Sequence, residues 1–263
     1  NMNIKTLKSN YKKGLIEKKD IIKKMHKKHS ILYDYSRFIK STNIQKIEIS
    51  DDRVIMTARD LGIKIICDPN DKRIAPLEIL NFDNFENNDF PMLLSLTYDN
   101  MTFFDVGANI GWVSLCVAKS KKNIQVYAFE PIPKTYKLLQ SNIKFNKATN
   151  IHTYNFGLSN EKKKSKFYYT PYDSGSASEA NLKTFGSIQK ISGLLTTLDS
   201  FMSKKRIKVD FIKCDIEGAE LFFFQGAINT IKKNKPIIFS EMLRKWTKKF
   251  NYHPNDIIYL LSN

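Results

Sequence analysis

The fold of this chain is decided by Phe103-Phe104-Asp105-Val106-Gly107-Ala108-Asn109-Ile110-Gly111-Trp112. A short apolar run ends in an acid and turns through two glycines into an apolar-periodic segment, which predicts a buried strand followed by a tight turn and a helix. Glycine has no Cβ, so a ligand can approach the backbone of such a turn closely. A second apolar run, Gln125 to Phe129, ends at Glu130. Together these features predict half of a nucleotide-binding α/β unit, in which Glu130 binds a ribose diol at the carboxyl ends of the strands.

The alternative interpretation is a generic α/β crossover whose glycines only make the turn. The spacing G-x-x-x-G differs from the dinucleotide fingerprint G-x-G-x-x-G, which argues against NAD or FAD and suits a nucleoside ligand without phosphates. S-adenosylmethionine fits, because its amino-acid end can meet the turn and its ribose the acid. The segment resembles the first two motifs of the class I methyltransferases, as D-V-G-A-N-I-G-W and A-F-E-P. We therefore expect cofactor contacts from Asp105, Gly107, Asn109, Gly111, Trp112, Glu130, Pro131, Gly157 and Asp215.

Strand and helix patterns alternate from Met101 onward, which predicts right-handed crossovers and a parallel sheet with helices on both faces. The predicted strands are Thr102–Val106, Gln125–Glu130, Ile151–Phe156, Val209–Cys214 and Ile237–Glu241. The predicted helices lie near Gly111–Lys119, Pro133–Lys147, Ala219–Lys233 and Pro254–Leu261. A long insertion between the third and fourth strands includes the polar Asp173–Asn181, which we interpret as a mobile lid, with a surface loop as the alternative.

The sequence divides into a helical N-terminal arm (1–42), a small hairpin with a helical lead-in (43–100) and a catalytic core (101–263). Apolar residues recur at helical intervals from Lys5 to Lys40, which predicts one or two amphipathic helices that pack on the core or on a second copy of the chain. A membrane-surface helix is the weaker alternative, because the stripe is thin and lacks Trp. Ile44–Ile49 and Val54–Ala58 read as a hairpin, and Ile63–Cys67 as a third strand.

Composition narrows the function classes. The chain of 263 residues has a formal net charge of +17, but only six of its 43 basic residues are Arg, the residue that bidentate phosphate and base recognition favours. A solvated lysine surface is therefore favoured over attraction of an anionic substrate, and duplex binding is the least favoured. The three cysteines lie far apart in apolar runs and read as reduced core residues. No apolar run is long enough to cross a bilayer, and we expect a cytoplasmic protein without a membrane span.

A cluster of carboxylates follows the predicted fourth strand in Asp210-Phe211-Ile212-Lys213-Cys214-Asp215-Ile216-Glu217-Gly218-Ala219-Glu220. Carboxylates at a strand end need a cation nearby, which a sulfonium cofactor, a metal or Lys213 would supply. We assign Glu220 to the first turn of the next helix, where its charge favours the helix dipole, and function to Asp215 and Glu217.

This block resembles the FkbM family of methyltransferases, together with T-L-D-S upstream and the strand ending at Glu241 downstream. The resemblance runs from about Met101 to Glu241 and implies a Rossmann-like class I fold, S-adenosylmethionine as donor and O-methylation of a small molecule or a glycan. A class I sheet normally finishes with an antiparallel pair after the fifth strand, whereas this chain stops at Asn263 near a helix; we favour truncation of the C-terminal strands.

Methyl transfer is an in-line displacement, so the enzyme must align the acceptor oxygen with the sulfonium methyl, and a hydroxyl acceptor must also lose its proton. The catalytic candidates are Asp215, Glu217, Glu241 and Lys213, whereas His253 is better explained by a surface turn. No metal site is predicted. A divalent cation held by Asp215 and Glu241 is the minority alternative, since no third ligand is evident.

The residues after the fourth strand lack the Pro-Pro-aromatic pattern of amino methylation, and the chain contains no Pro-Cys nucleophile for cytosine methylation. We therefore predict an O-methyltransferase that acts on a sugar hydroxyl or a phosphoryl or phosphoramidate oxygen of a bacterial surface-polysaccharide (capsule) precursor. Its partners would be this substrate and a second copy of the chain through the N-terminal helices. The alternative is an RNA-binding protein or an RNA methyltransferase, motivated by the charge.

Overall fold

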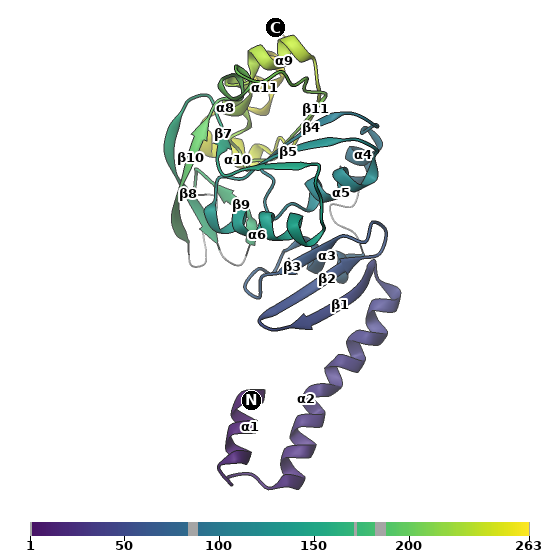
Figure 1. The fold of residues 1–263 in the computed structure, drawn as a ribbon. Coiled ribbons are helices and arrows are strands. Elements are labelled where there is room, and N and C mark those ends of the chain that lie inside the picture. Colours follow the sequence, from purple (N-terminus) through teal and green to yellow (C-terminus); the bar gives the residue numbers. More distant parts are fainter. Residues whose placement is uncertain (1, 84–88, 171–172, 182–187, 263) are drawn as a thin grey trace.

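A computed structural model describes residues 2–83, 89–170, 173–181 and 188–262. The chain runs from an N-terminal helical hairpin through a small three-stranded sheet into an α/β body (Figure 1). The fold class predicted from the sequence is confirmed, since a parallel sheet with helices forms the body. Within the described part of the chain, no helix is both long enough and apolar enough to span a bilayer.

The central sheet of the body has five parallel strands in the order β12-β11-β4-β5-β6. Its strands are β4 (Thr102–Val106), β5 (Gln125–Phe129), β6 (Ile151–Tyr154), β11 (Phe211–Cys214) and β12 (Ile237–Ser240). The helices of the body are α5 (Trp112–Ser120), α6 (Pro133–Phe145), α7 (Leu198–Met202), α8 (Glu220–Gln225), α9 (Ile228–Asn234), α10 (Arg244–Thr247) and α11 (Pro254–Ser262), with a 3-10 helix η2 at Lys248–Phe250.

Both faces of this sheet are covered by apolar side chains, as expected for a parallel sheet. Alternate residues of a strand point to opposite faces, and Phe103 and Phe104 of β4 accordingly belong to two different core clusters. The cluster around Phe103 contains Leu115 of α5 and Leu139 of α6. The cluster around Phe104 contains Phe223 of α8 and residues of α7 and α11. The two clusters fix the sheet between two helical layers, so its carboxyl edge is held rigidly.

The insertion between β6 and β11 forms a second sheet of four strands in the order β7-β10-β8-β9. Its strands are β7 (Gly157–Leu158), β8 (Lys163–Thr170), β9 (Asp173–Ser178) and β10 (Gln189–Thr196). The prediction of a loop at Asp173–Asn181 is therefore wrong for Asp173–Ser178. These six residues form a strand that pairs antiparallel with β8. The predicted third strand also ends early, since the chain leaves the central sheet after Tyr154 and joins the second sheet at Gly157.

The single helix predicted for Ala219–Lys233 is two helices, α8 and α9, separated at Gly226. A Cβ at Gly226 would lie 2.0 Å from the backbone oxygen of Ser159, so the body packs too tightly there for any other residue. The break is thus a packing feature that helical periodicity does not reveal.

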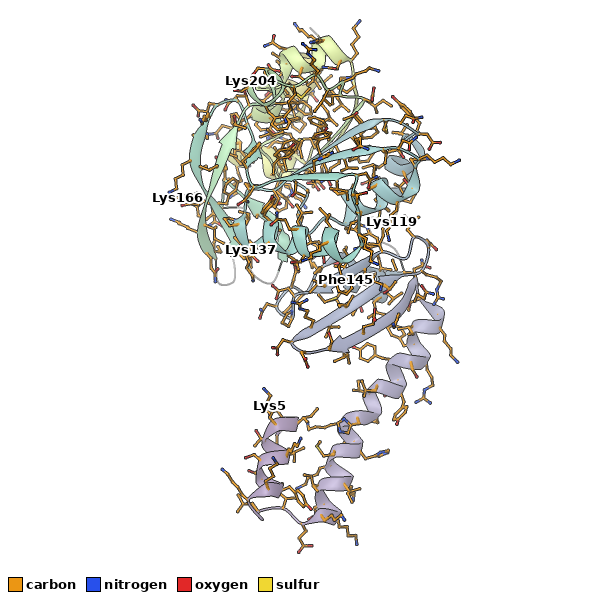
Figure 2. The ribbon with its side chains drawn as sticks, viewed as in Figure 1. Lys5, Lys119, Lys137, Phe145, Lys166 and Lys204 are labelled. Carbon is orange, nitrogen blue, oxygen red and sulfur yellow. The ribbon has the colours of Figure 1, made fainter. Side chains whose placement is uncertain are left out.

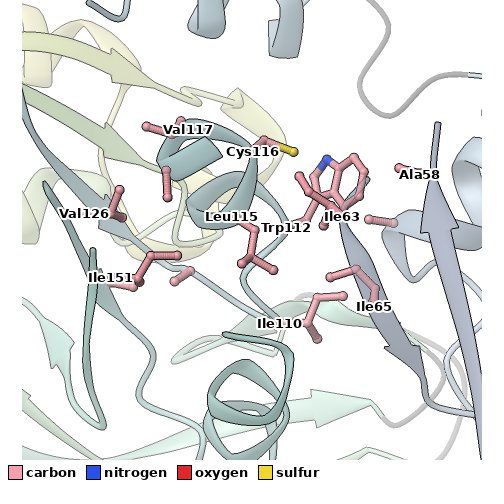
Figure 3. Close-up of a cluster of buried hydrophobic side chains, with 14 of the residues drawn as sticks. Ala58, Ile63, Ile65, Ile110, Trp112, Leu115, Cys116, Val117, Val126 and Ile151 are labelled. Carbon is pink, nitrogen blue, oxygen red and sulfur yellow. The ribbon is translucent and has the colours of Figure 1, made fainter. Parts of the chain in front are cut away.

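The three-stranded antiparallel sheet consists of β1 (Ile44–Ser50), β2 (Arg53–Ala58) and β3 (Lys64–Cys67), as the sequence pattern predicted. Two short helices, α3 (Ala75–Phe82) and α4 (Asp89–Ser95), connect it to the body. Its apolar face shares one core cluster with α5 and α6: Ile63 and Ile65 lie with Trp112 and Leu115 in Figure 3. The small sheet and the α/β body therefore do not have separate cores.

Asn142 of α6 and Asn146, which caps the end of this helix, bind the free edge of β3. The Asn142 Oδ1 accepts from the Ile66 N–H at 3.0 Å, and the Asn146 Oδ1 accepts from the Lys64 N–H at 2.9 Å. Figure 2 marks Phe145 at this junction, where the Lys64 ammonium lies 5.6 Å from its ring centroid. Polar side chains thus complete the edge of the small sheet and attach it to the body.

The N-terminal arm is a hairpin of α1 (Ile4–Lys12) and α2 (Lys18–Phe38), followed by a 3-10 turn η1 (Ile39–Ser41). α1 contacts α2 and buries Leu7, whereas α2 has no buried residue. Figure 1 shows the hairpin extending away from the α/β body. The predicted helices are present, but α2 is not packed on the core.

Candidate functional site

A cavity lies at the carboxyl edge of the central sheet, where β4, β5 and β11 end. The space between its walls is about 620 Å³, including space open to solvent. The second sheet forms its far wall through β8, β9 and β10. The lining residues are Val106, Gly107, Asn109, Glu130, Pro131, Ile132, Gly157, Leu158, Phe167, Gly175, Ala177, Glu179, Leu195, Asp215, Ile216, Glu217 and Ala219.

The glycine turn after β4 forms the floor of the cavity. Gly107 has φ +82°, and a Cβ at this position would lie 2.1 Å from the backbone oxygen of Asp215. The N–H groups of Gly107 and Ala108 both donate to the Phe129 carbonyl, at 3.2 and 3.0 Å. Gly107 therefore permits a close approach of three strand ends that no side chain would allow.

Glu130, at the end of β5, faces the same turn. One carboxylate oxygen accepts from the Asn109 N–H at 3.0 Å and the other from the Ile132 N–H at 2.8 Å. The side chain is buried, and burial raises the pKa of Glu130 to about 7 although these two hydrogen bonds oppose the shift. Each oxygen keeps a second lone pair, so the carboxylate can still accept from hydroxyl groups in the cavity.

Lys213 and Asp105 lie beneath the turn rather than in the cavity wall. The Lys213 ammonium donates to the Gly107 carbonyl at 3.0 Å and forms ion pairs with Asp105 at 3.3 Å and Asp215 at 3.7 Å. Asp105 is fully buried and accepts from the Ser114 hydroxyl at 2.6 Å. These contacts connect β4, β11 and α5 under the site, so they position the turn and Asp215.

The loop after β11 brings two carboxylates to the cavity, those of Asp215 and Glu217. Glu217 has φ +56° and Gly218 φ +99°, so the backbone reverses sharply here. The Ser178 hydroxyl of β9 donates to the Glu217 carbonyl at 2.9 Å. This bond attaches the second sheet to the loop, so both walls of the cavity are fixed to each other.

Glu220 supports this loop from within. Its carboxylate accepts from the N–H groups of Ile216 at 3.1 Å and Gly218 at 3.0 Å, and from the Tyr252 hydroxyl at 3.2 Å. Burial raises the pKa of Glu220. The structural role that the sequence favoured for Glu220 agrees with these contacts, although they are backbone hydrogen bonds to the preceding loop rather than a dipole effect.

Five of the residues proposed for the site from the sequence do not line the cavity. Besides Lys213 and Asp105, Gly111 begins α5 at φ +89°, and a Cβ there would lie 2.5 Å from Leu139, so it serves helix packing. Trp112 faces the other way, into the core shared with Ile63 and Ile65 (Figure 3). Glu241 is exposed beyond β12, where its N–H donates to the Cys214 carbonyl at 3.1 Å.

The remaining candidates are brought together: Gly107, Asn109, Glu130, Pro131, Gly157, Asp215 and Glu217 all line the cavity. His253 lies at the start of α11, where its ring accepts from the Asn255 N–H at 3.2 Å, as expected for a surface turn. No group of three or more His, Cys, Asp or Glu side chains is arranged to hold a metal ion within residues 2–83, 89–170, 173–181 and 188–262.

The sequence reasoning missed the residues that the second sheet contributes. Phe167, Leu195 and Glu179 reach the cavity from β8, β10 and the end of β9. The Glu179 carboxylate accepts a hydrogen bond from Ser165 and lies 3.8 Å from the Lys163 ammonium. Lys163–Thr170 reads K-K-S-K-F-Y-Y-T, without a regular alternation of polar and apolar residues, so no local signal indicated that this segment forms a strand whose buried side chains reach the cavity.

This chain is similar in sequence to known methyltransferases. A sequence model of the methyltransferase FkbM domain matches residues 105–263, which is more than half of the chain. Methyltransferase 1 of Beauveria bassiana (strain ARSEF 2860) is 23% identical over 146 residues, which is 49% of this chain and 59% of that protein.

Among solved structures, methyltransferase FkbM from Methylobacillus flagellatus KT has 21% identity and a TM-score of 0.44, covering 63% of this chain and 38% of that one. Trm5b from Pyrococcus abyssi has 15% identity and a TM-score of 0.42, covering 82% of this chain and 53% of that one. The chain thus spans less than two thirds of the length of each of these relatives. The match over residues 105–263 shows that this chain belongs to the FkbM methyltransferase family.

Proposed function

We propose that this protein is an S-adenosylmethionine-dependent O-methyltransferase whose acceptor is an oxygen of a bacterial surface-polysaccharide precursor. The observation that carries the proposal is the cavity at the ends of β4, β5 and β11, where the Gly107 turn, the Glu130 carboxylate and the Asp215–Glu217 loop meet. This is the edge at which open parallel sheets bind nucleotides.

The lining fits a cationic nucleoside. Its described residues include the carboxylates of Glu130, Glu179, Asp215 and Glu217 and no Lys, Arg or His, so the cavity favours positive charge. Apolar side chains from Ile132, Leu158, Phe167 and Leu195 offer a surface for a purine ring. Glu130 would hold the ribose, and the Gly107 turn would approach the amino-acid end of the cofactor.

When bound, the cofactor supplies an electrophilic methyl group on a sulfonium. The acceptor oxygen forms the new C–O bond as the C–S bond breaks, and the electron pair of that bond stays on sulfur. Asp215 and Glu217, whose residues line the cavity, would take the proton from a hydroxyl acceptor. The rigid attachment of their loop to β4 and β9 supports a positioning role, which can lower a barrier by roughly 7–11 kcal/mol in favourable cases.

Of the acceptors considered, the lining favours a sugar hydroxyl over a phosphoryl oxygen, because the described carboxylates would repel an anion. Lys213, the cation that an anionic acceptor would need, is only 9% exposed and already contacts Gly107, Asp105 and Asp215. The RNA alternative rests on charge. Figure 2 marks lysines on α1, α5, α6, β8 and the segment after α7, and none of these five lysines lines the cavity.

Two measurements test this proposal. Calorimetry with S-adenosylmethionine and S-adenosylhomocysteine should give saturable binding, and its absence would refute the cofactor assignment. Mass spectrometry of surface glycans and their nucleotide-linked precursors, with and without the protein, should show a methyl group that depends on it. If the glycans are unchanged while RNA methylation differs, the acceptor assignment is wrong.

A further inference from the structure

The turn of the N-terminal hairpin, residues 12–19, is an ordered tip at the end of the molecule opposite to the α/β body (Figure 1). Gly14 has φ +72° and its N–H donates to the Tyr11 carbonyl at 3.0 Å, while the Leu15 N–H donates to the Asn10 carbonyl at 2.9 Å. This pair of bonds is the Schellman closure of a helix. The tip therefore has a fixed backbone rather than a frayed one.

An apolar side chain is presented at this tip. In a Schellman closure the residue in the position of Leu15 commonly packs back on the helix that it terminates, yet the side chain of Leu15 is 70% exposed. Tyr11, near the end of α1, and Ile22, near the start of α2, are further exposed apolar residues of the hairpin. Apolar area held in water by an ordered backbone favours a partner that covers it.

Four exposed lysines flank Leu15 in the sequence of the turn: Lys12, Lys13, Lys18 and Lys19. Residues 2–40 contain twelve Lys and Arg and three Asp and Glu, so this arm carries a formal +9 of the +17 of the chain. A tip of this kind, with an apolar centre and a cationic rim, is complementary to a surface that is apolar inside and anionic outside.

Other partners would match either the charge or the apolar side chain of the tip, but not both. A second copy of the arm would bring two +9 hairpins together, and like charges oppose that contact. A nucleic acid would attract the lysines but would leave Leu15 and Ile22 without an apolar partner. An anionic lipid surface accepts both, since its headgroups attract the ammonium groups and its acyl boundary accepts leucine.

We propose that the α1–α2 hairpin docks tip-first on an anionic lipid surface, with Leu15 inserted at the headgroup level and the four flanking lysines on anionic headgroups. α2 has 21 residues, which at about 1.5 Å per residue is about 30 Å. The small sheet and the catalytic cavity then stand away from the lipid, at a distance set by the length of α2. This proposal does not depend on the methyltransferase assignment.

Co-sedimentation of the full chain with phosphatidylcholine vesicles, with and without phosphatidylglycerol, tests this docking. Binding is expected only with phosphatidylglycerol and should weaken as salt rises. Replacing Lys12, Lys13, Lys18 and Lys19 together by Gln should lower the partition coefficient at least about tenfold, because each lysine near an anionic surface contributes about fivefold. Leu15→Ser should lower it about tenfold while leaving the charge unchanged.

The matched control replaces Lys232, Lys233, Lys248 and Lys249, which are exposed on α9 and η2, by Gln. This variant has the same net charge as the tip variant and should bind vesicles like the unaltered protein. Equal losses in both variants would show unspecific charge attraction and overturn the proposal. So would absence of vesicle binding at low salt, or sedimentation velocity showing a dimer that the tip substitutions dissociate. Circular dichroism of each variant checks that α1 and α2 remain helical.

Discussion

Glu130 is the residue whose charge state should control cofactor binding. Burial raises the pKa of its carboxyl to about 7, so in the ligand-free protein it gains a proton as the pH falls through neutrality. Only the ionised form has the lone pairs to accept from a ribose diol while holding the Asn109 and Ile132 N–H groups. We therefore expect cofactor affinity to be constant above about pH 8 and to fall toward tenfold per pH unit below the pKa, as measured by calorimetry.

Glu130→Gln is the matching substitution, because it keeps the size of the side chain and removes its titration. At pH 8 the variant should bind the cofactor about 10- to 100-fold more weakly, because it loses a charge-assisted hydrogen-bond acceptor worth about 1.5–3 kcal/mol. Its cofactor affinity should also no longer change with pH. If the variant retains the same pH profile as the unaltered protein, another group is responsible and the ribose assignment fails.

Gly107 gives a second test at this scale. Gly107→Ala would place a Cβ against the Asp215 carbonyl, so β4 and the loop after β11 must separate and both stability and cofactor binding should be lost. Gly62→Ala is the matched control, since Gly62 also has a positive φ (+60°) but nothing within 4 Å of its Cβ position. The control should lose only about 1–2 kcal/mol of unfolding free energy, the cost of placing a residue with a Cβ at positive φ. Equal losses in urea unfolding would contradict the close-approach argument.

Residues at the ends of consecutive strands were predictable because the chain order of an α/β unit fixes where they meet. Gly107, Glu130 and Asp215 follow strand patterns directly, and the structure places all three at one cavity. Trp112 was misplaced because a side chain at a helix start can face either side, and here packing against β3 decides. Glu179 was missed because its position depends on the pairing of β8 with β9 and β10, whose register local sequence does not determine.

At the scale of elements, the attachment of β3 to α6 should contribute measurably to stability. Asn142 is fully buried; its Oδ1 accepts from the Ile66 N–H and its Nδ2 donates to the Ile110 carbonyl at 2.9 Å. Asn142→Ala would leave both backbone groups without this partner, at a cost of about 1–3 kcal/mol for each buried group. We expect a clearly lower free energy of unfolding in urea.

Gln140→Ala on the exposed face of the same helix is the control, since it removes a single exposed hydrogen bond to the Tyr136 hydroxyl. Its stability should stay within about 0.5 kcal/mol of the unaltered protein. If Asn142→Ala behaves like this control, the small sheet is held by its apolar face alone.

Element prediction succeeded where one local pattern was sufficient and failed where distant packing intervened. The five parallel strands were predictable from apolar runs that end in turn residues, because both of their faces are buried. The break at Gly226 and the strand at Asp173–Ser178 were not, since the first depends on contact with Ser159 and the second on pairing with β8. A polar, Gly- and Ser-containing segment reads as a loop unless its partner strand is known.

At the scale of the whole molecule, the body and the arm differ in how much buried core they contain. The small sheet and the α/β body share one core cluster, so they should unfold together. The arm joins them through η1, where the Arg59 guanidinium donates to the carbonyls of Ile39, Thr42 and Ile44. α2 itself has no buried residue. The buried residue of α1 is Leu7, and α1 contacts α2.

A chain that begins at Arg37 should therefore keep the urea midpoint and the cofactor affinity of the full chain. It retains Ile39 and the carbonyls that Arg59 binds, while it loses two helices that stabilise little else. The far-ultraviolet helical signal should fall, and binding to phosphatidylglycerol vesicles should disappear. A lower urea midpoint would instead show that the arm packs on the body or on a second copy in solution, as the apolar stripe first suggested. The two outcomes are distinguishable because a self-associated arm would make the midpoint depend on protein concentration, whereas an arm folded back on its own body would not.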